Sequence, residues 1–321
     1  MGRPGGITPN FRLEKPTVNS MKQVAVVGLG NIGWRYDFTD GVFQETAKSH
    51  FGAVMAIPEL KLKYGVDLDV SKSQEISKVS NINLLGFDSF VSQEYSYDLL
   101  ILATPRNKHL EVLQELIKIH RFDSVILEKP CGDCLEDCKV ILDLLEENSK
   151  KWQVNYFRSV LPHTLRALKR VRDLNLKSTK ASIIGYGDFQ NIFSHFIHLL
   201  LLFIEEDYHV IDACSVEHDR AKMRFSNGFE IDFHNINGPK QNLPILSILM
   251  DNHKLIFRDN GQVIELSNPS GSEVQEIFKL ETFDRYQHLA TLEYLERFHR
   301  GASANRLSVE MVHKIANALH L

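Results

Sequence analysis

The sequence contains no hydrophobic run long enough to cross a membrane and little excess charge of either sign. Its longest apolar run, Leu199–Ile204, is far shorter than the roughly 20 residues that a membrane-spanning helix needs. Residues 1–20 hold no apolar core of a secretion signal and are rich in glycine, proline and asparagine, so we expect a flexible tail there. The net charge of −4 and the lack of a basic stripe argue against nucleic-acid binding. These absences predict a cytoplasmic protein that binds neither membranes nor nucleic acids.

Cysteine is scarce as well, with four residues in 321. Cys131, Cys134 and Cys138 lie close together, which raises the alternative of a metal site. A closed zinc site needs four ligands, and the fourth would have to be Cys214 or a distant histidine. Cys138 fits better into an apolar helical stripe with Leu135, Ile141, Leu142 and Leu145. We therefore predict reduced thiols and no metal.

What the sequence does contain is a glycine-rich turn directly after a short apolar strand, Val24–Val27. Gly28, Gly30 and Gly33 follow in the order G-x-G-x-x-G, the fingerprint of dinucleotide binding when a strand precedes it and a helix follows. The first glycine permits a tight turn, the second lets the backbone approach a pyrophosphate, and the third lets the helix pack on the strand. Glycines also mark ordinary turns, so the preceding strand is what favours a nucleotide site.

The residues after the glycines predict an interrupted helix and then a second strand. We expect a helix to begin at 31–36, an inserted loop at 38–44, a helix over 46–57 and a strand over 60–66 that ends at Asp67. A carboxylate there can accept hydrogen bonds from the adenosine ribose and repels a 2′-phosphate, which predicts NAD rather than NADP. The loop accounts for a spacing about twice the roughly 20 residues of the simple fingerprint. Alternatively, the carboxylate caps the next helix.

Further apolar strands are predicted at 98–103 and 124–127, with a helical face of Leu110, Leu113 and Ile117 between them. Strands that alternate with helices in this way form right-handed βαβ units and a parallel sheet. Ligands of such sheets lie beyond the carboxyl ends of the strands. The fold class we predict is therefore an α/β Rossmann domain over 21–150.

From about Trp152 the pattern changes to that of an α+β domain over 151–321. The pairs Asn227-Gly228 and Asn260-Gly261 are each flanked by alternating apolar residues, a pattern typical of hairpins with type I′ turns. Two amphipathic helices follow, one with Leu289, Leu292, Leu295 and Phe298 on a face, the other with Leu307, Met311, Ile315 and Leu319. We predict an antiparallel sheet with helices, whose last two helices are free to pack back on the first domain.

Lys129 is the first candidate for catalysis. It follows an apolar strand and lies between Glu128 and Pro130. Partial desolvation and a nearby cationic nicotinamide would lower the pKa of this lysine and allow proton transfer near neutral pH. The alternative is a surface ion pair with Glu128.

A second candidate lies on a predicted helix that carries Asn191, His195 and His198 on one face beside four leucines. Polar groups next to such an apolar run must find partners in the protein or in a ligand. Histidine is the side chain best suited to move a proton at neutral pH. A hydrogen-bonded core histidine is the alternative, and a metal site is disfavoured because no third ligand is near in sequence.

A third candidate segment, Val154–Arg158, is predicted to extend a strand. It carries Asn155, Tyr156 and Arg158, which could orient a hydroxylated or anionic substrate. The same strand edge could instead face water.

Together these motifs resemble the glucose–fructose oxidoreductase / inositol dehydrogenase / MocA-type (Gfo/Idh/MocA) oxidoreductases from Met21 onward. Within this family, Tyr36-Asp37, Ser49-His50 and the segment from Asn191 to His198 are similar to a branch of bacterial surface-polysaccharide sugar enzymes. The motifs that carry the family resemblance are Gly28–Gly33, Ala103-Thr104-Pro105 with His109, Glu128-Lys129-Pro130, Asn155–Arg158 and Ser194–Ile197.

The resemblance implies a C-terminal domain with a large, mostly antiparallel sheet, often used for homodimer or homotetramer contacts. It also implies NAD(P)-dependent hydride transfer at a hydroxyl-bearing carbon of a sugar or cyclitol. Lys129 and His195 take the catalytic positions, whereas the family's neighbouring aspartates are Asn191 and His198 here. The predicted substrate-binding residues are Asn155, Tyr156, Arg158, Asn191 and His198. The predicted cofactor-binding residues are Gly28, Gly30, Asn31, Ile32, Gly33, Asp67, Ala103, Thr104, Pro105, Asn107, His109, Glu128 and Lys129.

The function predicted from the sequence is NAD(P)-dependent oxidation or reduction of a sugar or sugar derivative. Two alternatives remain. The protein could be a nucleotide-binding regulator without turnover, because Asn191 cannot accept a proton as a carboxylate can. It could also carry out redox-neutral sugar chemistry with tightly bound NAD, since one fold hosts many reactions.

Overall fold

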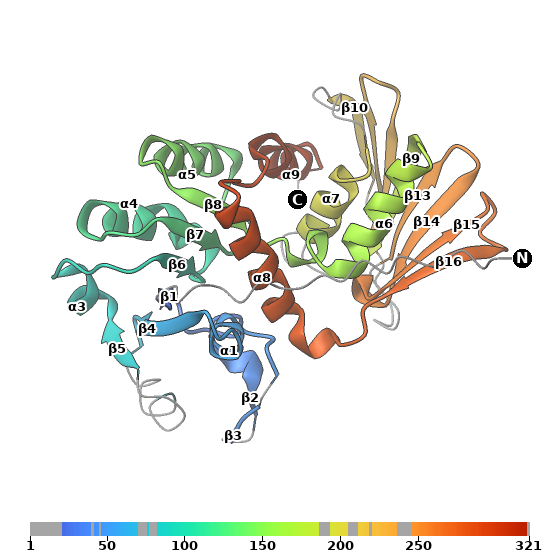
Figure 1. The fold of residues 1–321 in the computed structure, drawn as a ribbon. Coiled ribbons are helices and arrows are strands. Elements are labelled where there is room, and N and C mark those ends of the chain that lie inside the picture. The colour runs from blue at the N-terminus through green and yellow to red at the C-terminus, as the bar shows by residue number, and fades with distance from the viewer. Residues whose placement is uncertain are drawn as a thin grey trace, which may run out of the picture.

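Two β-sheets, one in each half of the chain, organise the computed structural model (Figure 1). The expected tail at 1–20 and Asn191 lie outside the described residues. The structure describes residues 21–39, 42–44, 46–69, 76, 82–185, 193–204, 211–217, 220–235 and 245–319.

The first sheet has six strands, all parallel, in the order β5-β4-β1-β6-β7-β8. This is the strand order of a Rossmann fold, so the predicted fold class is confirmed. The division at residue 150 stays a prediction, and the sheet itself continues through Val154. The strands are β1 (Lys22–Val27), β4 (Leu60–Asp67), β5 (Asn83–Gly86), β6 (Leu99–Leu102), β7 (Ser124–Leu127) and β8 (Lys151–Val154).

Helices cover both faces of this sheet, because alternate residues of its strands point to opposite sides. Ala25 and Val27 face a core with α3 (Phe87–Val91), α4 (His109–Ile119) and α5 (Leu135–Glu147). Val24 and Val26 face a second core with α1 (His50–Ala56) and α8 (Tyr286–His299), so a helix from the end of the chain packs on the first domain. Cys138 is fully buried in the first core, and all four cysteines are free. Within the described ranges, no three possible ligands are grouped around a metal position.

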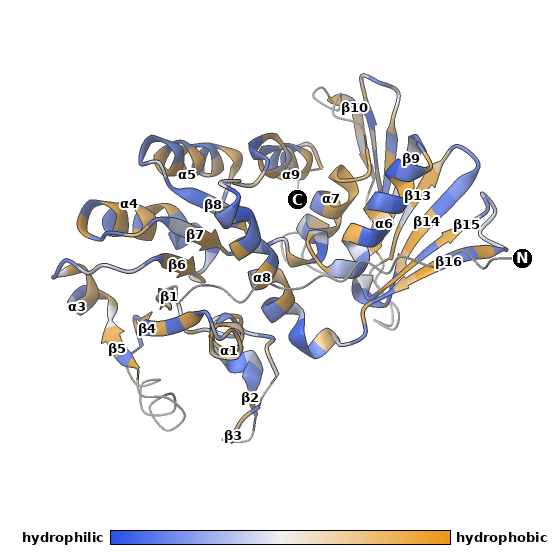
Figure 2. Ribbon diagram, in the orientation of Figure 1, coloured by the Kyte–Doolittle hydropathy of each residue, from blue (hydrophilic) through white to orange (hydrophobic). Residues whose placement is uncertain are grey.

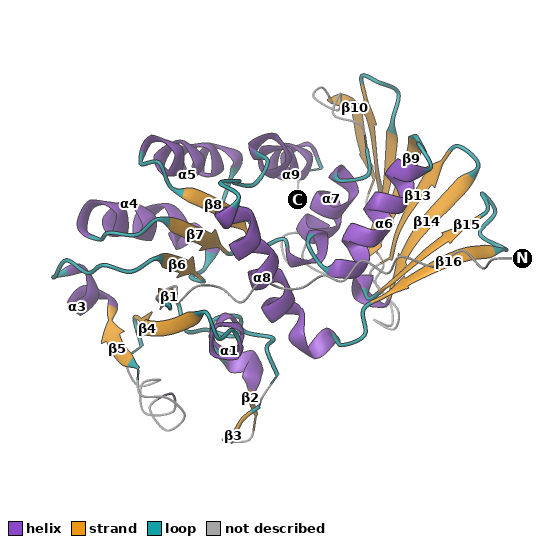
Figure 3. Ribbon diagram, viewed as in Figure 1, coloured by secondary structure: helices purple, strands orange, loops and turns teal. Residues whose placement is uncertain are grey.

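The second sheet has eight strands in the order β10-β11-β12-β9-β13-β14-β15-β16. Only β9 and β12 pair in parallel, so the mostly antiparallel prediction is confirmed. The helices α6 (Pro162–Asp173) and α7 (Phe193–Leu201) lie on one side of it (Figure 3). The strands are β9 (Ser178–Gly185), β10 (Ile211–Glu217), β11 (Arg220–Phe225), β12 (Glu230–Asn235), β13 (Ile245–Met250), β14 (His253–Arg258), β15 (Val263–Ser267) and β16 (Val274–Lys279).

The central strands of the first sheet, coloured hydrophobic in Figure 2, differ from strands of the second sheet in how completely they are buried. Every residue of β6 and β7 is buried, whereas buried and more exposed residues alternate along β11 and β13. This difference follows from helices on both faces of the first sheet and on one face of the second.

Both predicted hairpins form, and the turn of the first differs from the predicted type. Asn227 does not have the positive φ that a type I′ turn requires, and Gly228 alone is left-handed, with φ 83°. In the second hairpin Asn260 (φ 58°) and Gly261 (φ 82°) have the positive φ of a type I′ turn, and the Gln262 N–H donates to the Asp259 carbonyl at 3.1 Å.

The two C-terminal helices form as predicted. Met311, Ile315 and Leu319 of the second are buried as predicted, whereas the buried face of α8 is shifted. In α8 the buried face is formed by Gln287, Ala290, Tyr294 and Phe298, and Leu292 is 40% exposed. The second helix, α9 (Arg306–Ala318), packs against α5 and α7. No helix in the described part of the chain is long and apolar enough to span a membrane.

Candidate active site at the carboxyl ends of the first sheet

The glycine turn after β1 has the geometry of a phosphate-binding loop. Gly28 has φ 96°, and a Cβ there would lie 2.6 Å from the backbone of Ala103. A Cβ on Gly33 would overlap the carbonyl oxygen of Gly28, so both positions exclude side chains. A Cβ on Gly30 would meet nothing within 4 Å, which leaves open space over the turn. Nearby, Thr104 Oγ1 is enclosed without a hydrogen-bond partner among the described residues. These features fit a bound dinucleotide.

Asp67, at the end of β4, lies directly beside this turn. Its Oδ2 accepts a hydrogen bond of 2.6 Å from the Leu29 N–H, and its Oδ1 accepts one of 2.9 Å from the Asp69 N–H. The carboxylate is thereby held at the edge of the loop, where the adenosine ribose of a dinucleotide would lie.

The helix predicted at 31–36 is not continuous. Its first turn is followed by a 3₁₀ turn (Arg35–Asp37) and by the short strands β2 (Phe38–Thr39) and β3 (Val42–Phe43). The helix then resumes at His50 rather than at Thr46. The carbonyl of Ile32 accepts from the His50 N–H at 2.9 Å, and that of Gly33 accepts from the Phe51 N–H at 3.0 Å. The inserted segment therefore leaves the helix and returns to it, with α1 stacked on the first turn.

Asp37 closes this insertion. Its buried carboxylate accepts hydrogen bonds from Thr46 Oγ1, the Lys48 N–H, and both the N–H and the hydroxyl of Ser49. A Cβ on Gly52 would overlap the same carboxylate. The Tyr36-Asp37 and Ser49-His50 motifs thus belong to one structure, which closes the loop and sets the position of His50.

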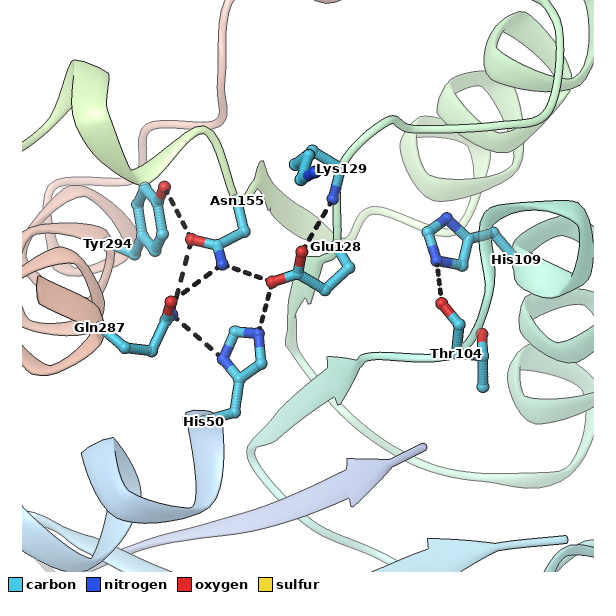
Figure 4. Close-up of polar contacts among 8 residues, drawn as sticks. All are labelled: His50, Thr104, His109, Glu128, Lys129, Asn155, Gln287 and Tyr294. Atoms are coloured by element: carbon cyan, nitrogen blue, oxygen red, sulfur yellow. Dashed lines mark hydrogen bonds and ion pairs between the residues drawn. The ribbon is translucent and has the colours of Figure 1, made fainter. Parts of the chain in front are cut away.

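His50 belongs to a ring of buried polar side chains (Figure 4). Its Nε2 lies 2.8 Å from Glu128 Oε1, and its Nδ1 lies 3.1 Å from Gln287 Nε2. Asn155 Nδ2 donates to Glu128 Oε1 and, at 3.0 Å, to Gln287 Oε1. The ring joins α1, α8 and the carboxyl ends of β7 and β8.

The orientation of each group in the ring follows from the carboxylate. An ionised carboxylate only accepts, so His50 donates from Nε2 to Glu128. The neutral His50 imidazole then accepts at Nδ1 from Gln287 Nε2. The Tyr294 hydroxyl donates to Asn155 Oδ1 at 3.3 Å. Burial alone would raise the pKa of Glu128, but hydrogen bonds from His50 and Asn155 and the charge of Lys129 lower that pKa below its usual range. The structure therefore contains a buried anion that the chain itself satisfies.

Lys129 follows this ring directly. Its N–H donates to Glu128 Oε2 at 3.3 Å, and its peptide bond to Pro130 is cis. His109 lies across the next loop, with Nε2 2.9 Å from the Thr104 carbonyl and Nδ1 3.0 Å from the Cys131 carbonyl. Burial lowers the pKa of His109, so the neutral ring donates to only one of them at a time.

His195 reaches the same region from α7 of the second domain. The ring is buried, with its edge against Phe157 at 4.9 Å between centroids, and its Nδ1 has no partner within the described chain. Burial, then the charges of Arg158 and Lys129, lower the pKa of His195 far below its usual range. The two predicted catalytic residues are thus brought close enough for the lysine charge to act on a neutral imidazole.

The predicted strand over 154–158 ends at Val154, and the residues after it form a loop and a 3₁₀ turn, Phe157–Ser159. Tyr156 is buried and stacks on His198 with centroids 4.2 Å apart. His198 Nδ1 lies 2.6 Å from Ser159 Oγ. Burial, with a contribution from the charge of Arg297, lowers the pKa of His198 to about 3.

Of the five predicted substrate-binding residues, Asn155, Tyr156 and His198 make the protein contacts above, and Asn191 is not described. Arg158 is buried and donates to Asn260, from Nε to the backbone oxygen at 3.0 Å and from Nη2 to Oδ1 at 2.5 Å. Sequence reasoning missed Gln287 and Tyr294. The only signal in the sequence was a glutamine one turn before Ala290 and two turns before Tyr294 in an amphipathic helix.

Comparison with known proteins agrees with this geometry. Residues 22–156 match the family described as an oxidoreductase family with an NAD-binding Rossmann fold. This part of the chain is thereby identified as the Rossmann domain of the Gfo/Idh/MocA oxidoreductases. None of the curated proteins matches this sequence.

Solved structures extend the likeness to the whole fold. A dehydrogenase from Chromobacterium violaceum has a TM-score of 0.73 at 14% identity, covering 94% of this chain and 95% of that one. A super-repressor mutant of Gal80p from Saccharomyces cerevisiae has a TM-score of 0.73 at 13% identity, with 93% and 95% covered. A 3-ketoreductase from Actinomadura kijaniata, in complex with TDP-benzene and NADP, has a TM-score of 0.72 at 12% identity, with 93% and 96% covered. At these identities the likeness concerns the fold alone.

Proposed function

We propose that this protein is an NAD-dependent oxidoreductase that transfers a hydride between nicotinamide and a hydroxyl-bearing carbon of a sugar or sugar derivative. The observation that supports the proposal is that Lys129, which follows β7, lies near enough to the buried His195 for its charge to lower the pKa of that imidazole. A lysine and a neutral imidazole at that place can hold a hydroxyl group and exchange its proton.

The cofactor residues are proposed as the sequence predicts them. When bound, the nicotinamide supplies the hydride acceptor or donor. Gly28, Gly30 and Gly33, with the N–H groups of Asn31 and Ile32, would hold the pyrophosphate. The remaining cofactor-binding assignments are Asp67 at the ribose, followed by Ala103, Thr104, Pro105, Asn107, His109, Glu128 and Lys129.

Lys129 and His195 have different roles at the substrate hydroxyl group. The lysine ammonium donates a hydrogen bond to the hydroxyl oxygen or the developing alkoxide. His195, whose lowered pKa keeps it neutral, accepts the hydroxyl proton in oxidation and returns it in reduction. Asn155, Tyr156, Arg158, Asn191 and His198 are proposed to shape or orient the substrate site.

The choice of NAD over NADP rests on Asp67. Its carboxylate is fixed at the edge of the turn, and a negative charge there repels a 2′-phosphate. Tighter binding of NADH than of NADPH, measured by fluorescence titration, is the expected result. A preference for NADPH would contradict this part of the proposal.

The test of the proposed function is Lys129→Met, assayed on a panel of sugars with NAD and NADP by absorbance of the reduced nicotinamide. We expect turnover to fall by about 10³-fold while NADH binding persists, because the variant loses the group that stabilises the alkoxide. Lys118→Met is the matched control, since Lys118 is exposed on α4 and pairs only with Glu115. Equal turnover of Lys129→Met and wild type on the true substrate would rule out the assigned role.

One observation favours the alternative of a nucleotide-binding regulator or a redox-neutral enzyme. The family position three residues after the histidine, usually an aspartate, is His198, a stacked imidazole with a pKa near 3 that cannot replace a carboxylate. NADH binding without turnover of any sugar would favour the regulator. Cofactor that copurifies and never dissociates during turnover would favour redox-neutral chemistry.

The setting is also proposed from the sequence. We propose that the protein is cytoplasmic, which its free cysteines support. We propose that it acts in surface-polysaccharide sugar metabolism, which the closed Tyr36-Asp37 and Ser49-His50 loop supports. A homodimer or homotetramer is proposed from the family resemblance. A monomer in light scattering at micromolar concentration would contradict the assembly.

A further inference from the structure

Arg158 is a buried cation that pairs with no anion among the described residues. Its side chain is enclosed between the rings of Phe157 and Phe196, 4.5 and 5.5 Å from the guanidinium carbon, and the residue is 8% exposed. Its hydrogen bonds all go to neutral oxygen atoms of Asn260. Burial lowers the pKa of Arg158 to about 10, so the group stays charged at neutral pH. Among the residues that the structure describes, no carboxylate forms an ion pair with it.

An uncompensated buried charge is costly, and native proteins pair such charges with an opposite one. The guanidinium also has unused capacity to donate hydrogen bonds. Nη1 has no hydrogen-bond partner in the described ranges, yet it is not among the fully enclosed unpartnered atoms, so part of it remains accessible to a ligand. A guanidinium with a free edge is suited to a planar carboxylate or to a phosphate.

The position of Arg158 links this capacity to the candidate active site. Its charge and that of Lys129 both act on His195, one from the loop after β8 and the other from the loop after β7. Phe157, the next residue, contacts the His195 ring. An anion bound at Arg158 would therefore lie next to the imidazole that exchanges the substrate proton.

We propose that the sugar substrate carries an oxyanion, a carboxylate or a phosphate, and that Arg158 binds it. This inference rests on the proposed function, because it names the substrate class of the same site. The two possible sources of the oxyanion are an acidic sugar and a phosphorylated or nucleotide-linked sugar.

Holding the Asn260 turn does not require a charge at position 158. His163 already fixes the same turn, since its Nε2 lies 2.7 Å from the Gly261 carbonyl and a carbonyl only accepts. Burial lowers the pKa of His163, so a neutral side chain performs this role. His163→Phe is therefore the matched control, because it releases the turn without removing the cation.

The experiment is calorimetric titration in the presence of NADH, which needs no turnover. The four probes are a neutral hexose, the corresponding hexuronate, the hexose 1-phosphate and a nucleoside-diphosphate hexose. We expect wild type to bind at least one anionic probe about 100-fold more tightly than the neutral hexose. Arg158→Gln should lose that difference, Arg158→Lys should keep part of it, and His163→Phe should keep most of it. The probe that binds most tightly identifies the source of the oxyanion.

Equal affinity of wild type for neutral and anionic probes, or no binding of any anionic probe, would overturn the inference. An equal loss in Arg158→Gln and His163→Phe would also overturn it, since the turn and not the charge would then be responsible. If Arg158→Gln does not fold, the wild-type comparison and Arg158→Lys still decide. Anion-selective binding without hydride transfer to any probe would contradict the proposed function but leave the anion site in place.

Discussion

The first domain contains a buried anion and the loop after its last strand contains a buried cation, and the chain treats them differently. Glu128 receives hydrogen bonds from His50, from Asn155 and from the Lys129 N–H, which compensate for its burial. Within the described ranges, Arg158 has two neutral acceptors, both from Asn260. A charge that the protein satisfies fully stabilises the fold, whereas one that it leaves partly unsatisfied is available to a ligand.

The largest effect expected from this comparison is that of removing the satisfied anion. Glu128→Leu leaves His50 and Asn155 with buried, unpartnered donors, so the free energy of unfolding should fall by about 4 kcal/mol. Urea denaturation monitored by circular dichroism measures it. The control Glu111→Leu removes an exposed carboxylate that pairs only with Lys108 and should change stability by less than about 0.5 kcal/mol. Similar values for both variants would show that the ring does not stabilise the fold.

A second buried carboxylate, that of Asp37, gives another test of how far satisfied anions stabilise the fold. Asp37 accepts from both the side chain and the backbone of the loop that it closes. Asp37→Asn places an amide donor against these donors, which should cost about 2 kcal/mol of unfolding free energy. Because the loop positions His50, we also expect NADH affinity to fall. Unchanged stability in thermal unfolding would mean that the insertion is held in place by other contacts.

The smallest effect concerns a buried group that stays neutral. The pKa of His198 is lowered from about 6.5 to about 3, so the unfolded chain binds one more proton than the folded chain between these values. The contribution of this group to stability is complete above pH 6.5 and falls as the pH drops toward 3. His198→Phe, which keeps an aromatic ring against Tyr156, should flatten the slope of stability against pH near pH 5 by about 1.4 kcal/mol per pH unit. An unchanged slope in urea titrations at several pH values would contradict the lowered pKa.

Helices and strands that are determined by residues close together in the sequence were predictable. The strand predicted at 124–127 matches β7 residue for residue, and the apolar stripe around Cys138 forms α5. The interruption of the helix after the glycines was predicted, but the point where the helix resumes was placed four residues early, because the hydrogen bonds that fix it connect Ile32 and Gly33 to His50 and Phe51 across the insertion.

The site was predictable only in part, for the same reason. Lys129 and the glycines lie in motifs that a sequence displays directly. Gln287 reaches Asn155 and His50 from a distant part of the chain, so no local pattern could have paired them. The turn at Asn260 was predicted from its residues, but its contact with Arg158 depends on how the two segments pack.

The helix after the glycine turn is split, yet α1 continues the hydrogen-bond pattern of its first turn. Trp34 and Arg35 still donate to the Gly30 carbonyl, and His50 occupies the place in the hydrogen-bond ladder that the next residue would take. A shorter or longer excursion between Arg35 and His50 would therefore leave the phosphate end and the imidazole in the same helical register. Only the hairpin between Phe38 and Gln44 can therefore change in length without moving His50, because the contacts of Asp37 with Thr46, Lys48 and Ser49 must be kept.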